Sequence, residues 1–498
     1  MNSLKHQLLE VVASGVLFNI SNPSVPPDVE ELFLSQDRSM LVLTLISCWL
    51  LFYMCISVSS IKQLPAIKRI SDILPEKGWV MLSGFLSKIL IQVLDLESDL
   101  HLSADVVQHL ILTTIILHAS YRLYHPTCYR RLWTILAMSA TNTLLSLAII
   151  NILLSKLYAP WLDPELTVFD CLEFSCIICA VGKYSKCLIS SHFVILDPSA
   201  MLAVMDAESP LYYLVVGQSI FNYGVAYLLL ECVNQFTSFS QEVILVNFDL
   251  ETLGYITVSL LVDPMVGGLI GLISALLSMF ILKSMSHQPD INFLKPLVIL
   301  LLAAFGYLIS SIFGFSAIIC LIVYGLTAEV LTFNNIEVSG NVTVPSIING
   351  LATVLETLLF FYIGFQITSL LASMEEIWQF SLAVLVSITV SRTLVTTLLC
   401  LLLNIFGPDD LKISWRWQIL IICGGIRGAV SFAMVTQIPE ERQDRAEEFH
   451  DTTVLIILVT TLSNGILLKI LPWLLSMTDT ENDARNTNKD EDPEENEQ

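Results

Sequence analysis

Long apolar segments recur from one end of the chain to the other, and this pattern limits what the chain can fold into. Of its 498 residues, 54% are hydrophobic and 14% are charged, whereas soluble domains carry roughly 25% charged residues. A helix needs roughly 20 apolar residues to cross a bilayer. About thirteen segments qualify by that measure, near 39–61, 70–88, 104–124, 132–155, 167–200, 210–234, 252–283, 294–312, 314–330, 344–369, 376–405, 415–438 and 450–475. We therefore predict an all-α polytopic membrane protein.

Charge composition excludes several classes of function. The formal net charge is −22, which argues against binding to nucleic acid because phosphates require a basic surface. Part of the acidic excess lies in residues 476–498, which are too polar to bury a core, so we expect a disordered tail there. No catalytic triad or metal-ligand spacing is present, so we expect no enzyme activity, no metal and no cofactor.

The basic residues predict the orientation in the membrane. Lys and Arg gather in the loops after the first, third and seventh segments and before the twelfth, while the alternate loops lean acidic. Cytoplasmic loops carry the excess of Lys and Arg. We therefore expect residues 1–38 to be extracellular, 39–475 to form the transmembrane domain and the tail to be cytoplasmic.

Charged side chains inside a bilayer are energetically costly and mark ion paths or internal pairs. The expected spans contain Asp197, Asp263, Glu356, Arg392 and Arg427, together with Glu173, Glu231 and His118. Helix-breaking residues accompany three of these positions, at Asp197-Pro198, Asp263-Pro264 and Gly424-Gly425. Interrupted helices within a membrane are typical of secondary transporters, in which the exposed backbone lines the ion site.

Four stretches resemble motifs of the sodium/proton exchangers, within the cation/proton antiporter superfamily. Residues 421–433 resemble GGxRGAxxxAL, 197–204 resemble (T/S)DPVAVLAV, 217–224 fall where GESxxNDG belongs, and 355–364 resemble SExxxFxxLG. The resemblance implies inverted repeats, two crossing broken helices (those with Asp197 and with Gly424 and Gly425), a core domain and a dimerisation domain. It also implies a homodimer that exchanges sodium or potassium for protons and thereby regulates pH.

The chain departs from the family at the positions that would carry the ion. Asn222-Tyr223 stands where the family has asparagine and aspartate, and Gln218 replaces its glutamate. A phenol has an ordinary pKa of about 10, so it cannot alternate between sodium and proton at neutral pH. Asp197 is our first candidate for a replacement carrier and Asp263 is the second.

Other charged residues are expected to have supporting roles. We expect Glu356 to pair with a cation such as Arg427, and Arg392 to lack the family's glutamate counter-ion. Glu231 lies near the end of its span and is expected to be interfacial.

Residues 182–196 look like an insertion. Joining Val181 to Asp197 gives a closer match to the family motif, and Gly182-Lys183-Tyr184 can be encoded by codons that contain GTAAGT, a usual intron start. A retained intron is therefore one hypothesis.

Two functions stay open at this point. The chain is either an ion exchanger, which we expect in the plasma membrane rather than in an intracellular one, or a transport-inactive homologue that acts as a regulatory or dimer-partner subunit.

Overall fold

The computed structural model describes residues 75–93, 102–121, 123, 129–158, 166–180, 210–239, 250–285, 294–335, 338–407, 412–438 and 443–474. The expected first span, the stretch 182–196, Asp197 and the acidic tail lie outside these residues. The described part is helical throughout, with the elements α4 (Glu76–Val93), η1 (Val106–Leu112), α5 (Thr113–Tyr121), α7 (Leu132–Ile152), η2 (Leu153–Tyr158), α9 (Val168–Cys179), α11 (Pro210–Phe239), α12 (Leu250–Met285), α13 (Leu294–Ile312), α14 (Ala317–Asn335), α15 (Val338–Phe406), α16 (Trp415–Cys423), α17 (Ala429–Val435) and α18 (Gln443–Leu474).

The prediction of a polytopic all-α membrane protein is confirmed. Within the described residues, six helical segments are long and apolar enough to cross a bilayer. A helix also forms within the expected segment 70–88, which contains Pro75, Glu76 and Lys77, and α4 begins directly after Pro75. Proline at a helix start is favourable because its missing N–H is not needed there.

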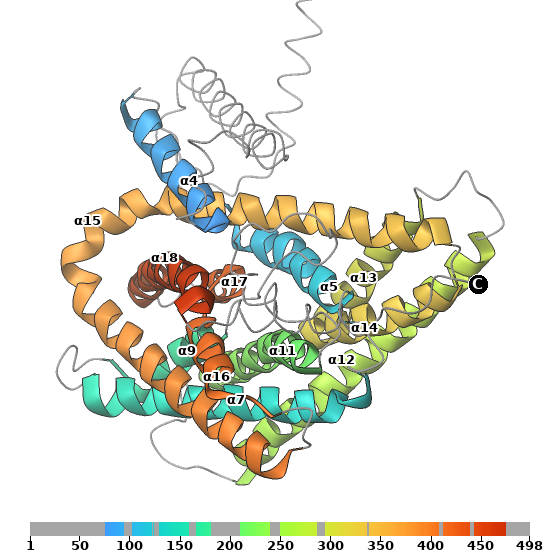
Figure 1. The fold of residues 1–498 in the computed structure, drawn as a ribbon, viewed down its shortest axis with the longest axis horizontal. Coiled ribbons are helices and arrows are strands. Elements are labelled where there is room, and N and C mark those ends of the chain that lie inside the picture. Colours follow the sequence, from blue (N-terminus) through green and yellow to red (C-terminus); the bar gives the residue numbers. More distant parts are fainter. Residues whose placement is uncertain are drawn as a thin grey trace, which may run out of the picture.

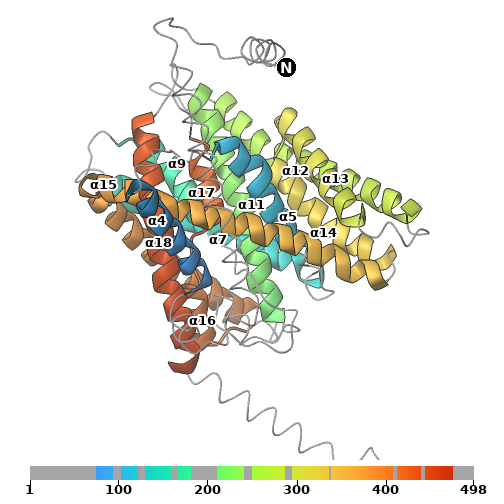
Figure 2. The same cartoon turned by 90° about the horizontal axis from the view of Figure 1, so that it is seen from above.

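The helices form two groups joined by α15, which also carries α4. Helices α12, α13 and α14 pack together with α5, while α11 packs against α7 and α9. Figures 1 and 2 show the first group on one side of the molecule and α7, α9, α16, α17 and α18 on the other. Helix α15 contacts α5 and α13 of the first group as well as α7 and α18 of the second, so it connects the two groups.

Two expected features differ from the structure. The spans 344–369 and 376–405 are parts of one continuous helix, α15, because the residues between them (372–376, Ala-Ser-Met-Glu-Glu) contain no helix breaker. Helix α12 likewise continues through Pro264 instead of breaking there. The nearby glycines of α12 serve packing, since a Cβ on Gly267 would lie 2.4 Å from the Ser316 carbonyl oxygen.

The start of α9 is fixed locally by a capping box. The Thr167 hydroxyl accepts a hydrogen bond from the Asp170 N–H at 3.2 Å, and the Asp170 carboxylate accepts one from the Thr167 N–H at 3.0 Å. Such reciprocal bonds satisfy amide groups that the first helical turn leaves open. The box sets where α9 begins, and hence where its far end at Cys179 meets the candidate site.

Candidate functional site

A helix interruption lies at the centre of the second group. Helix α16 ends at Cys423, the four residues 425–428 are not helical, and α17 begins at Ala429. The Gly424 N–H still donates to the Leu420 carbonyl at 2.8 Å, so the first half-helix closes its last turn. The interruption coincides with Gly424 and Gly425, the residues at which the sequence predicts it.

Polar side chains of α18 satisfy the backbone of this interruption. The Arg427 N–H donates to the Thr460 hydroxyl at 3.3 Å, and the Asn464 side-chain amide donates to the Gly425 carbonyl at 3.4 Å. Backbone groups without partners would be costly at membrane depth. Helix α18 therefore stabilises the non-helical segment by providing hydrogen-bond partners for its backbone.

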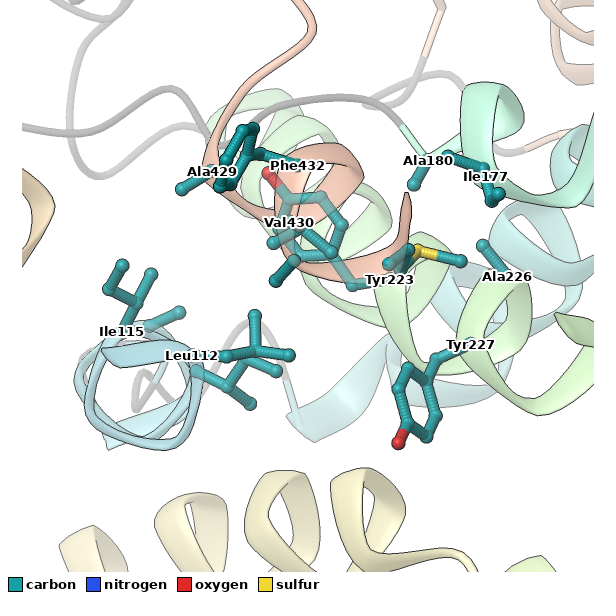
Figure 3. Packing of buried hydrophobic residues seen from close by; sticks show 14 of the residues in the cluster. Leu112, Ile115, Ile177, Ala180, Tyr223, Ala226, Tyr227, Ala429, Val430 and Phe432 are labelled. Carbon is teal, nitrogen blue, oxygen red and sulfur yellow. The ribbon is translucent and has the colours of Figure 1, made fainter. Parts of the chain in front are cut away.

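The end of α9 meets the start of α17. The Ser431 hydroxyl donates to the Ala180 carbonyl at 3.1 Å, although 251 residues separate them. The Arg427 guanidinium, only 2% exposed, lies close enough to Cys179 to interact electrostatically. Figure 3 shows Ala180 and Ile177 on the same side of α17 as Ala226 of α11. Asp197, which follows α9 in the chain, lies outside the described residues.

Helix α11 places Asn222 and Tyr223 beside this meeting point. Their side chains are 1% and 3% exposed. The Thr143 hydroxyl of α7 donates to the Asn222 side-chain oxygen, and the Ser139 hydroxyl donates to the Gln218 carbonyl at 3.0 Å. The Tyr223 ring lies between α11 and α17, with its hydroxyl directed toward Phe432 (Figure 3). A buried phenol thus occupies the position that the resemblance assigns to a carboxylate.

Arg392 lies across the helix interruption. Its Nη2 donates to the Ile421 carbonyl at 3.1 Å, at the end of α16 where the helix dipole is negative. A Cβ on Gly425 would be 3.2 Å from Arg392 Nε, so the missing side chain of Gly425 makes room for the guanidinium. In the absence of the family's glutamate, Arg392 thus has a backbone carbonyl as its acceptor.

Glu356 has a cation beside it, but the residue differs from the one expected. Lys77 Nζ of α4 lies 2.6 Å from Glu356 Oε1, and their side chains are 23% and 16% exposed. Lys77 Nζ also lies 4.7 Å from the centre of the Phe360 ring. The expected partner, Arg427, is instead buried near the end of α9.

Asp263 lies on α12, apart from the helix interruption, and Glu231 of α11 lies near it. Glu231 of α11 interacts electrostatically with Asp263, and its Oε2 is buried. One carboxylate oxygen of Glu231 is thus buried within the protein, and its position near the membrane interface stays a prediction. The sequence offered one signal, a spacing of four between Tyr227 and Glu231, which places both on one face of a helix.

Comparison with known proteins identifies the fold and the family. A family described as the transmembrane part of sodium/hydrogen exchangers matches residues 53–474. Sodium/hydrogen exchanger 3 of Didelphis virginiana is 25% identical over 82% of this chain and 46% of its own length. Na(+)/H(+) exchanger protein 7 of Caenorhabditis elegans is 29% identical over 73% of this chain and 44% of its own. The chain thus spans about half the length of these relatives.

The fold also resembles a solved structure. That of the sodium proton antiporter MjNhaP1 from Methanocaldococcus jannaschii superposes with a TM-score of 0.59 at 16% identity, covering 86% of this chain and 98% of that one. At this identity the likeness concerns the fold alone. Since the family match extends over most of the chain, this protein belongs to the sodium/hydrogen exchanger family.

Proposed function

We propose that the chain is a secondary active transporter that exchanges sodium, or potassium, for protons across a membrane. The observation that carries this proposal is the contact between the end of α9 and the start of α17, next to Tyr223 of α11. An interrupted helix in a membrane-embedded core provides polar groups for a small cation. A carboxylate that binds either a cation or a proton crosses the membrane cheaply only when neutralised.

The carrier in this proposal is a carboxylate other than the family's usual one. Asp197 is the first candidate, and Asp263 the second. When the protein is reconstituted in vesicles, a sodium pulse should change the lumenal pH in the direction set by the sodium gradient. Asp197→Asn should abolish that flux, while Asp105→Asn, at an exposed helix start, should leave it unchanged. Full flux from Asp197→Asn would remove Asp197 from the proposal.

A second function is favoured by one specific observation. Tyr223 is buried, and neither it nor Gln218 can provide a carboxylate. The alternative is a transport-inactive homologue that serves as a regulatory or dimer-partner subunit. It predicts no flux from the natural chain and restored flux from the double variant Tyr223→Asp with Gln218→Glu. Sodium-dependent flux from the natural chain would exclude it.

The structural roles of the remaining charged residues belong to the same proposal. Arg392 and Arg427 compensate the half-helix ends at the interruption, and Glu356 is neutralised by Lys77. The proposed homodimer would join the apolar outer faces of α12 and α13, which include Leu269, Ile273, Phe280, Leu301 and Phe305. Crosslinking of cysteine pairs placed on these faces in native membranes tests that interface.

The proposed location is the plasma membrane, with the N-terminus outside and the C-terminus in the cytoplasm. The distribution of Lys and Arg among the loops supports this orientation. A C-terminal epitope tag on intact cells should stain only after permeabilisation. Staining without permeabilisation would reverse the orientation.

A further inference from the structure

The Phe432 ring of α17 contacts two other rings, one from each of two neighbouring helices. The centre of the His450 ring of α18 lies 5.4 Å from that of Phe432, with 66° between the ring planes. The Tyr362 ring of α15 lies 5.9 Å from Phe432 at 79°. Phe432 itself is fully buried, and edge-to-face pairs of this kind are favourable beyond the area that they bury. One side chain of α17 thus packs against both α15 and α18.

Asp451, the residue after His450, connects α18 to α15 at the same place. Its Oδ2 accepts a hydrogen bond from the Ser373 hydroxyl of α15 at 2.6 Å. Its Oδ1 lies 3.4 Å from His450 Nδ1. Because the two contacts use different oxygens, the carboxylate can keep both at once. Ser373 therefore holds the carboxylate beside the imidazole.

The two side chains of α18 are accessible near the start of that helix. His450 and Asp451 are 26% and 23% exposed. They follow the charged residues Arg445, Glu447 and Glu448, of which Arg445 and Glu448 pair with each other at 3.2 Å. So many charges are costly within hydrocarbon and favour the end of a span that meets water. A proton can therefore reach the imidazole from the aqueous phase.

The helices packed against α18 bring few other charges toward the imidazole. Helix α17 has no titratable side chain. Helix α15 brings Glu375, which is exposed, and α4 brings Lys88, whose Nζ lies 4.7 Å from the centre of the Phe365 ring. Arg416 of α16 lies in the first turn of that helix, at the opposite end from the interruption. Asp451 is the charged group in direct contact with the imidazole.

Protonation of His450 strengthens two of these contacts. The imidazolium forms an ion pair with Asp451 Oδ1, and such charge-assisted bonds are stronger than neutral ones. A cation within about 6 Å of an aromatic ring centre is also attracted to the ring, and Phe432 lies within that distance. A neutral imidazole has neither attraction. The contacts are therefore strongest in acid and weaken as the pH rises.

We propose that His450 is a proton-binding site that controls how firmly α17 is held. The protonated imidazole, positioned by Asp451, attracts Phe432 and so stabilises the half-helix that begins at Ala429, directly after the interruption. Loss of the proton leaves the Ser373–Asp451 bond in place but weakens the contact with α17. This proposal does not rest on ion exchange, because a transport-inactive subunit with the same contacts would respond to pH in the same way.

Hydrogen exchange of the natural chain in detergent tests the proposal. The exchange rates of the 429–435 amides, divided into the intrinsic rate at each pH, give protection factors. Histidine changes its charge between about pH 5 and about pH 8. We expect protection at about pH 5.5 to exceed that at about pH 8 by at least about threefold, the size expected for a partly exposed ion pair with a cation–π contact. Helix α14, in the first group of helices, should show no such difference.

Three variants identify the groups responsible. His450→Gln should remove the pH dependence and leave protection near the value of the natural chain at about pH 8. Asp451→Asn should reduce the dependence, because an amide oxygen still accepts the Ser373 hydrogen bond but carries no charge. His109→Gln is the matched control. His109 is exposed on η1 and contacts Tyr307 of α13 at 3.1 Å, so this variant should keep the full pH dependence.

Three outcomes would overturn the proposal. Equal protection of 429–435 at the two pH values would show that no proton stabilises α17. A difference of the same size in α14 would show a general effect of pH on the fold. Unchanged pH dependence in His450→Gln would assign the proton to another group. The first two comparisons use the natural chain, so they do not require any variant to fold.

Discussion

Replacing either glycine at the crossing of α4 and α15 should force the two helices apart. A Cβ on Gly364 would lie 2.0 Å from the Met81 carbonyl oxygen, and one on Gly84 would lie 2.1 Å from the Phe361 carbonyl oxygen. Real Cβ atoms essentially never approach another atom closer than 3.0 Å, so the backbones must part by roughly 1 Å. Small residues of this kind allow membrane helices to approach closely.

The energetic consequence can be bounded. Separating packed surfaces by about 1 Å loses a quarter to a half of the dispersion attraction, and overpacking costs about 1–3 kcal/mol. Alanine is a better helix former than glycine by about 0.5–1 kcal/mol, which offsets part of that loss. We therefore expect Gly364→Ala to destabilise the fold by about 1–2 kcal/mol. The Lys77–Glu356 ion pair joins the same two helices, so it should lengthen as well.

The assay is thermal unfolding of detergent-purified protein, followed by tryptophan fluorescence. Gly350→Ala is the matched control, because it lies on the same helix and a Cβ there would meet nothing within 4 Å. Gly364→Ala and Gly84→Ala should each lower the melting temperature, whereas Gly350→Ala should leave it unchanged or raise it. Equal melting temperatures for Gly364→Ala and Gly350→Ala would refute the close packing of α4 against α15.

Three further predictions follow from the described contacts. Lys77→Met should lower the free energy of unfolding by about 1–3 kcal/mol, because it removes a charged hydrogen bond to Glu356. Lys77→Arg, which keeps the charge, should retain most of that stability. A melting temperature unchanged by Lys77→Met would contradict a stabilising Lys77–Glu356 ion pair. Ser431→Ala should lower the stability of the contact between α17 and the end of α9 by about 1 kcal/mol, because it removes the hydrogen bond to the Ala180 carbonyl. The backbone amides of 429–435 should then exchange hydrogen faster than in the natural chain, and an unchanged exchange rate would count against the contact. If 182–196 derive from a retained intron, transcript sequencing should find messages that lack these codons; their presence in every transcript would reject that origin.

The membrane architecture could be predicted from sequence because it depends on local composition. Apolar length predicted the helices from α5 to α18, the family resemblance helped to predict α4, and the glycine pair predicted where α16 ends. The predictions that differed were those in which a local signal competed with its surroundings. Pro264 is a helix breaker by propensity, yet α12 continues through it while packing closely against α14.

The partners of individual charges could not be predicted, because they depend on how distant helices pack. Lys77 and Glu356 are 279 residues apart, and no periodicity within either helix relates them. The same holds for Glu231 and Asp263, whose proximity results from the packing of α11 beside α12. Sequence spacing gives the face of a helix on which a residue lies, but not the neighbour that this face meets.

Helix α15 passes from one membrane span, Val344–Glu375, into the next, Ile377–Phe406, without a loop, and it curves along its length in Figure 1. Its contacts with α4 lie at Glu356 and Gly364, and its contact with α16 lies at Arg392, so one unbroken helical backbone joins the two sites. An epitope or fluorescent protein inserted at 375–377 would interrupt that backbone between them. Engineers who need a tolerant insertion point should therefore avoid this junction, even though hydropathy alone would suggest a surface turn there.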